Sequence, residues 1–369
     1  MIDFRYHLVS IIAVFLALTV GLALGTTMLQ DPLLSTLQSE TADLRGQSEE
    51  LRLERDAAER VNDGADDLSE AAAEDLLEDR LRGLGVAVVV APGADEDMAT
   101  ALSTRVEEAG GEVVGRLSFT EEFPDEANAA FVDELAVQVS AEAEEMSGGA
   151  YVRSATLIGG ALARTGDDEE SEDGEDEDGG GDGRESADDE EGSGDGEESE
   201  GGEGADPAAV LSAYTEADLL AVDGDPVGAA DAVLVVAPAV DGVEGDSERT
   251  NTVVATVAAT LREEVGPTVL AGDTRSGQGQ GLIAQVRAHE PSYATVDVAG
   301  RPMGDIVTVL ALADSLEGDG AAYGVGEGVE GFLPSPLPGP RSEGSDGDGG
   351  DGEASGRPDD EARRATGGE

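Results

Sequence analysis

The sequence predicts an α/β fold, in which one N-terminal transmembrane helix and a short coiled-coil stalk precede a mainly parallel sheet covered by helices. Three observations predict this class. Residues 8–29 carry no charged side chain, although the chain has a formal net charge of −62. Leucines recur at seven-residue intervals within residues 30–80. Further along, apolar runs such as VAVVVA and AVLVVA alternate with segments of helical periodicity, as in parallel sheets buried on both faces.

The uncharged run LVSIIAVFLALTVGLALGTTML at residues 8–29 predicts a transmembrane helix. At a rise of 1.5 Å per residue it is about 33 Å long, close to the thickness of a bilayer's hydrocarbon core. Arg5 and His7 precede it and Asp31 follows it, so the positive-inside rule leaves residues 1–7 in the cytoplasm and the rest outside. A secretory signal cleaved after Ala23-Leu24-Gly25 is the alternative, but the apolar run is longer than a signal requires.

Small residues follow one side of this helix. Ala13, Ala17, Gly21 and Gly25 recur at every fourth position, a spacing that lets two membrane helices approach closely. The stripe predicts a helix–helix interface.

The stalk at residues 30–80 has a heptad pattern. Leu37, Leu44, Leu51 and Ala58 are seven residues apart, and Leu34 precedes Leu37 by three. The companion positions are Thr41, Ser48 and Arg55, and Gly46 interrupts the helix. The pattern predicts a short, weak coiled coil, and together with the small-residue stripe it indicates a homo-oligomer.

Composition excludes several function classes. The chain has no cysteine, and all 21 of its basic residues are arginine. Disulfides, thiolate metal sites, Schiff-base chemistry and a Walker A lysine are therefore excluded. The acidic excess disfavours nucleic acid as a partner, because phosphate binding needs clustered basic side chains. It is also typical of proteins that fold in high salt.

Two segments are predicted to be disordered, and they divide the rest. Residues 166–206 contain 22 acidic residues and one arginine, so this insert cannot bury a core of its own. Residues 329–369 form the second segment, a tail that becomes rich in Gly and Asp. The α/β domain therefore consists of residues 81–165 and 207–328, enough for one substantial core.

The elements of the domain follow from their apolar patterns. Predicted strands are residues 86–91, 112–118, 232–237, 268–271 and 294–298. Predicted helices are residues 97–109, 125–146, 250–265, 281–289 and 303–316.

Signals for a site in the domain are weak. Gly277, Gly279 and Gly281, with Arg275 nearby, lie between a strand and a helix and suggest an anion cradle, although glycines there are more often turn formers. Asp241, Asp273 and Asp297 lie within or just after predicted strands, where α/β proteins bind ligands. His289 is the single histidine outside the N-terminal end. With no catalytic motif present, we expect no enzyme activity and no evident cofactor; whether a metal binds stays open.

The chain resembles the actinobacterial copper transporter family, the MctB-like proteins, which include SteB-like members. The opening MIDFRYHLVSIIAVFLALTVGLALGTTM carries the resemblance, together with VRAHEPSYATVDVAGRPMGDIVTVLALADSLEGDGAAYGVGEG and its T-V-D, A-L and Y-G-x-G series. The resemblance implies a cell-envelope protein with one N-terminal helix, held in the cell membrane with the outer envelope layer as a further location, that acts in copper efflux or homeostasis.

The residues themselves support the envelope placement better than the copper chemistry. Copper sites favour Cys, Met and His, whereas this chain has no Cys, two His and five scattered Met. SteB-like members imply an alternative, a non-enzymatic envelope scaffold that acts with a partner membrane protein in cell division or cell-wall remodelling.

Overall fold

The computed structural model describes residues 4–164, 205–238, 246–318 and 320–341, and it describes side chains outside residues 26–37 and 246–247. The chain divides into two compact units, Met1–Leu68 and Ser69–Glu369. The acidic insert up to residue 204, Leu34, Leu37 and Asp241 lie outside the described residues or side chains, as does the tail from residue 342.

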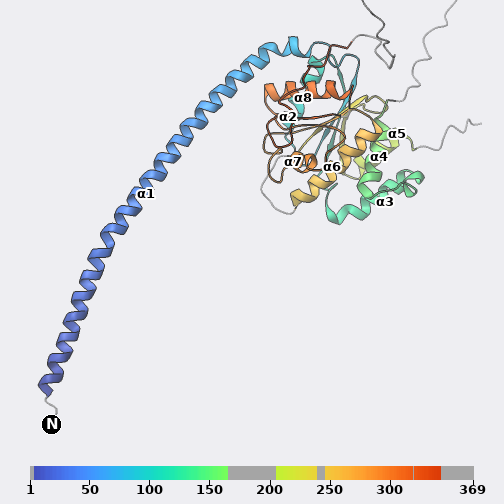
Figure 1. The fold of residues 1–369 in the computed structure, drawn as a ribbon. Helices are drawn as coiled ribbons and strands as arrows, with labels where there is room; N and C mark the ends of the chain where they lie inside the picture. The colour runs from blue at the N-terminus through green and yellow to red at the C-terminus, as the bar shows by residue number, and fades with distance from the viewer. Residues whose placement is uncertain (1–3, 165–204, 239–245, 319, 342–369) are drawn as a thin grey trace, which may run out of the picture. The chain divides into compact units, whose positions relative to one another are not determined.

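The first unit consists of one helix, the N-terminal part of α1 (Phe4–Leu77) (Figure 1). Among the described residues, α1 contains the one segment long and apolar enough to cross a membrane, Phe4–Gly25, with a mean hydropathy of 2.6. This segment begins four residues before the predicted run at residue 8. The predicted apolar helix is confirmed, whereas pairing of the stalk with a second helix stays a prediction.

The second unit is an α/β domain built on one seven-stranded sheet in the order β3-β2-β1-β4-β5-β6-β7. The strands are β1 (Gly85–Val90), β2 (Glu112–Phe119), β3 (Leu220–Gly224), β4 (Ala232–Val236), β5 (Thr268–Ala271), β6 (Ala294–Val296) and β7 (Ala322–Tyr323). All neighbouring strands are parallel except β3, which runs antiparallel to β2 at the edge. The mainly parallel sheet is therefore confirmed.

Helices cover both faces of the sheet (Figure 1). They are α2 (Glu96–Glu108), α3 (Ala129–Val139), α4 (Ala150–Leu162), α5 (Pro207–Glu216), α6 (Asp246–Glu264), α7 (Leu282–Arg287) and α8 (Pro302–Ser315), with short 3-10 helices η1 (Glu126–Asn128) and η2 (Ala141–Glu144). The end of α1, α2 and α8 pack on one face, and α3 to α7 pack on the other.

Strand β1 shows why a continuous apolar run predicts a strand of this sheet. Val86, Val88 and Val90 belong to the core on the α2/α8 side, whereas Ala87 and Val89 belong to the core on the other side. Every residue of the strand is buried, so both faces need apolar side chains and no polar alternation appears.

The structure corrects some predicted boundaries. Residues 125–146 are not one helix, because α3 ends where Ser140 adopts an extended conformation (φ −138°, ψ 124°) and η2 follows. Ser140 is buried, and Val137, Val139 and Ser140 are weaker helix formers than Ala or Leu. The predicted strand at residues 294–298 ends at Val296. Helices α4 and α5 and strands β3 and β7 were not predicted.

Two predicted disordered segments also extended too far into the domain. Asp206, placed in the acidic insert, is the N-cap of α5 and accepts a hydrogen bond from the Ala208 amide. Residues 329–341, placed in the tail, include contacts with the turn that follows α1. The Pro338 carbonyl accepts a hydrogen bond from the Arg80 guanidinium, and the Arg341 amide donates to the Asp79 carbonyl at 2.8 Å.

Candidate functional site

The carboxyl ends of β5 and β6 bring two of the predicted site residues to one edge of the sheet. Ala271 and Val296 are paired across these parallel strands, and Asp273 and Asp297 follow them within two residues. The Gly272 amide donates to the Val296 carbonyl at 2.9 Å. Two loops that are distant in sequence therefore begin side by side, as the aspartate pattern predicted.

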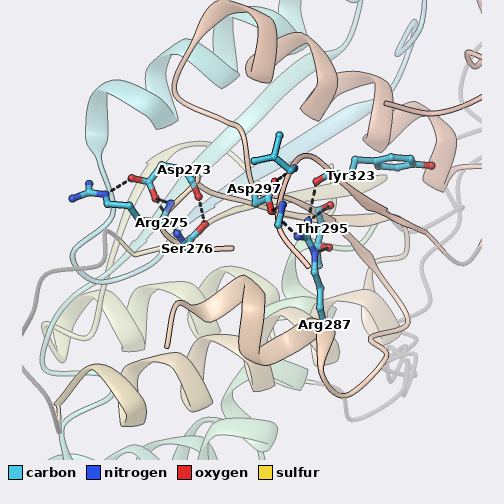
Figure 2. Close-up of polar contacts among 9 residues, drawn as sticks. Asp273, Arg275, Ser276, Arg287, Thr295, Asp297 and Tyr323 are labelled. Atoms are coloured by element: carbon cyan, nitrogen blue, oxygen red, sulfur yellow. Dashed lines mark hydrogen bonds and ion pairs between the residues drawn. The ribbon is translucent and has the colours of Figure 1, made fainter. Parts of the chain in front are cut away.

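Asp297 is the centre of a buried polar cluster (Figure 2). Its side chain is 0% exposed, which would be costly for a charge without partners. Oδ1 accepts a hydrogen bond from the Val325 amide at 2.8 Å. Oδ2 accepts one from the Gly326 amide at 2.7 Å and one from the Arg287 guanidinium at 2.7 Å. Three donors of the chain itself therefore hold this carboxylate.

Arg287, the last residue of α7, connects the cluster to strands β6 and β7. Its Nε donates to the Thr295 hydroxyl at 2.9 Å, and its Nη2 donates to the Tyr323 carbonyl at 2.8 Å. Only 4% of its side chain is exposed. We call Arg287, Asp297 and the amides of Val325 and Gly326 the carboxylate clasp, because together they fasten β6, β7 and α7 to one another.

The clasp also explains the glycines of the Y-G-x-G series. Gly324 has φ +126°, and a Cβ atom there would lie 1.7 Å from Asp297 Oδ1. A Cβ atom on Gly326 would lie 2.3 Å from Asp297 Oδ2. The T-V-D and Y-G-x-G segments therefore serve one packing unit, in which the backbone must come close to the buried carboxylate.

Tyr323, from the same series, has its hydroxyl on the far side of the strand from the clasp. The hydroxyl donates to Asp314 Oδ2 at 2.6 Å. Burial, together with the neighbouring carboxylate, raises the pKa of the Tyr323 hydroxyl well above its usual range. This phenol stays neutral at physiological pH and acts as a hydrogen-bond donor.

Asp273 shapes the loop after β5 (Figure 2). Its Oδ1 accepts hydrogen bonds from the amides of Arg275 and Ser276, both at 3.0 Å. Its Oδ2 accepts one from the Arg275 guanidinium at 2.8 Å. The carboxylate therefore closes a local turn, with 28% of its side chain exposed.

The glycines of the predicted anion cradle have packing roles. A Cβ atom on Gly277 would lie 2.3 Å from the Asp297 carboxylate, and one on Gly281 would lie 2.3 Å from the Ser276 carbonyl oxygen. Both neighbouring atoms are negatively polarised, and the helix that follows, α7, has six residues. The loop is thus explained as a turn between β5 and α7 rather than as an anion site.

The remaining predicted site residues stand apart from the clasp. His289 is exposed after α7, with Nδ1 2.9 Å from the Gln285 carbonyl oxygen. Within the described ranges no group of three or more His, Cys, Asp or Glu residues is placed to hold a metal ion. In the apolar helix, Ala13, Ala17, Gly21 and Gly25 are all exposed, and a Cβ atom on Gly21 or Gly25 would meet no atom within 4 Å.

Arg287 is the side chain of the clasp that the sequence analysis missed. Its role is visible only when β6, β7 and α7 are brought together. The signal that was available was the R-x-H-E-P-S-Y-A-T-V-D spacing, which places an arginine ten residues before the aspartate.

Known proteins match this chain over most of its length. Residues 1–334 match a family described as "Copper transport outer membrane protein, MctB". The protein named copper transporter MctB in Mycobacterium tuberculosis is 31% identical over 334 residues, which cover 89% of this chain and 98% of the relative. The protein of the same name in Mycobacterium leprae is 30% identical over 337 residues, with the same coverage. Together with the apolar N-terminal helix, these matches show that the chain belongs to the MctB copper transporter family.

Proposed function

We propose that this protein acts in copper efflux or copper homeostasis from the cell envelope, anchored by Phe4–Gly25 with the N-terminus in the cytoplasm and the α/β domain outside. The observation that carries the proposal is the family match over residues 1–334, which includes both the apolar helix and the clasp motifs. The relatives that align over 89% of this chain and 98% of their own length are named copper transporters.

A path through the membrane lined by this chain alone would need more than one copy, because the described residues contain one candidate span. One helix cannot enclose a pore, so any path through the membrane would need several helices. Ala13, Ala17, Gly21 and Gly25 provide a surface for close helix packing. We therefore propose a homo-oligomer whose membrane helices meet along this stripe. Replacing Gly21 and Gly25 by Leu should weaken crosslinking between copies, and unchanged crosslinking would remove the stripe from the proposal.

The α/β domain has a non-enzymatic role in this proposal. Its buried ion pair is engaged within the fold. Copper would be cargo of the assembled protein, held transiently by exposed carboxylates or by a partner. No resident cofactor is needed.

A second candidate is the envelope scaffold that acts with a partner membrane protein. It is favoured by one observation, the lack of a cluster of metal-ligating side chains in the described part of the domain. A scaffold needs a folded domain and a membrane anchor, and the α/β domain and the apolar segment Phe4–Gly25 fit these two roles.

Deletion of the gene separates the two candidates. Copper hypersensitivity with raised cellular copper, reversed by the full-length chain, supports the copper role. Normal copper tolerance with chained or misshapen cells would reject that role and support the scaffold. Membrane fractionation of the same cells, with the mature N-terminus determined, tests the single-pass anchor; a start near Thr26 would reject it.

A further inference from the structure

Large aliphatic side chains are exposed on α1 beyond its membrane segment. Leu44 and Leu51 are each 65% exposed, Val61 is 71% exposed and Leu68 is 70% exposed. Apart from Leu53, which is also 65% exposed, the side chains between them on this part of the helix are mostly charged, polar or small. A single helix gains most of its stability in water by packing an apolar face against something else. These residues therefore indicate a missing partner surface.

The spacing of these residues defines one seam along the helix. Leu44, Leu51 and Ala58 are seven residues apart, and Val61 and Leu68 follow Ala58 by three and ten residues. At 3.6 residues per turn they occupy a sector about 120° wide. Their successive separations of seven, seven, three and seven residues place them at the two core positions of a heptad repeat. Gln47 and Glu54 interrupt its N-terminal half, so the apolar contact is continuous only from Ala58 onward.

We infer that the seam binds the same seam of a second copy in a parallel, in-register pair; this inference rests on the proposed self-association. The membrane segment of the same helix anchors every copy at its N-terminal end, which imposes a parallel orientation and raises the local concentration. An antiparallel pair would require the anchors to lie at opposite ends.

Charge complementarity supports a second copy as the occupant. In this register Glu50 and Arg55 flank the seam on opposite sides and are five residues apart, the separation at which flanking residues of parallel helices meet. Arg55 is 67% exposed, so its guanidinium is accessible to Glu50 of the other copy, in exchange for its contacts with Asp56 and Glu59 of its own helix.

This register differs from the heptad predicted by the sequence. The predicted companion positions were Thr41, Ser48 and Arg55, which are polar. The seam instead takes as companions the positions three residues after Leu44, Leu51 and Ala58, which are Gln47, Glu54 and Val61, and Leu68 follows Val61 by seven residues.

The chain contains no cysteine, so single-cysteine variants of the full-length protein test the seam directly. Leu51→Cys and Val61→Cys lie on it. Leu53→Cys is the matched control, because Leu53 is also 65% exposed but lies about 200° around the helix from Leu51. After diamide oxidation in native membranes, we expect disulfide-linked dimers at positions 51 and 61, at least fivefold more abundant than at position 53.

Equal crosslinking at all three positions, or preferential crosslinking at 53, would overturn the seam. A disulfide to a different protein would overturn the second copy as its occupant. Glu50→Arg should reduce the dimer formed by Leu51→Cys, and adding Arg55→Glu should restore it; loss without restoration would reject the parallel register. Copper tolerance of the deletion strain is scored separately. If the dimers form and the deletion strain tolerates copper normally, only the copper role is rejected. If the dimers do not form and the deletion strain is hypersensitive to copper, only the seam is rejected.

Discussion

The guanidinium of Arg287 and the carboxylate of Asp297 form an ion pair of 2.7 Å whose side chains are 4% and 0% exposed. The pair is ten residues apart in sequence and closes the loop between α7 and β6. Because the same carboxylate also accepts the amides of Val325 and Gly326, the pair connects the end of the sheet to the segment that follows β7.

Asp297→Ala should destabilise the domain strongly. It leaves the buried guanidinium of Arg287 without its counter-ion, a change that typically costs about 3–5 kcal/mol in the free energy of unfolding. Urea unfolding of the purified full-length protein measures it. Asp273→Ala is the control, because that carboxylate is 28% exposed and closes only a local turn; it should cost about 1 kcal/mol. Equal losses of unfolding free energy in the two variants would contradict a special contribution of the carboxylate clasp to stability.

Gly324→Ala should be much more damaging than Gly328→Ala. Both glycines have positive φ, +126° and +77°, and a non-glycine residue there costs about 1–2 kcal/mol. Only at Gly324 does the added Cβ also meet the buried carboxylate, at 1.7 Å, whereas at Gly328 the nearest atom is 3.8 Å away. Melting temperatures of the two variants, compared in one buffer, test the difference. Similar melting temperatures would show that backbone strain alone matters.

Helix α4 offers a second matched pair. Gly160 has open space around it, so Gly160→Ala should stabilise the helix by about 1 kcal/mol. Gly159 packs against α6, where an added Cβ would lie 2.7 Å from the Glu264 Cβ, and overpacking costs about 1–3 kcal/mol. Gly159→Ala should therefore be destabilising. Denaturant midpoints of the two variants should move in opposite directions.

Alkaline pH should destabilise the domain through its buried tyrosines. Burial raises the pKa of Tyr214 to about 12 and raises the pKa of Tyr293 as well. A raised pKa in the folded state means that the stabilisation is complete below the unfolded value of about 10 and is lost as the pH rises towards 12. Unfolding free energies between pH 9 and 11.5 should fall, and Tyr214→Phe should reduce the slope. An unchanged slope in Tyr214→Phe would contradict this origin of the alkaline destabilisation.

Salt should stabilise the protein because its net charge of −62 is self-repelling. The Debye length falls from about 10 Å at 0.1 M to about 3 Å at 1 M ionic strength. The melting temperature should therefore rise by several degrees over this range. Potassium chloride and potassium sulfate at equal ionic strength should act alike if screening is the cause. A rise in sulfate alone would point to strengthened apolar burial instead.

The strands that could be predicted from the sequence are mainly those buried on both faces of the sheet. Strands β1, β4 and β5 are continuous apolar runs because both faces of the sheet are covered. Strand β3 was missed because it is a short edge strand with only Leu220 buried, and β7 was missed because it has two residues. The boundary at Ser140 lies in a segment of weaker helix formers, but helix propensity alone does not determine the residue at which a helix ends.

The candidate site was only half predictable. Asp297 was singled out because it lies at the end of a strand, and the structure places it at that edge. Its donors come from Arg287 and from backbone amides at 325 and 326. Amides carry no sequence signal of their own. What the sequence did show was glycine at positions where a side chain would collide with the carboxylate.

The end of α1 is itself part of the domain core, since Ala73 is 5% exposed and Leu77 is fully buried on the α2/α8 side of the sheet. Proteolytic shedding of the domain is therefore constrained by where the cut falls. A protease that cleaves before Ser69 would release an intact domain, whereas one that cleaves after Leu77 would open a cavity in its core. A stable soluble fragment recovered from cells should retain these last turns of the helix at its N-terminus.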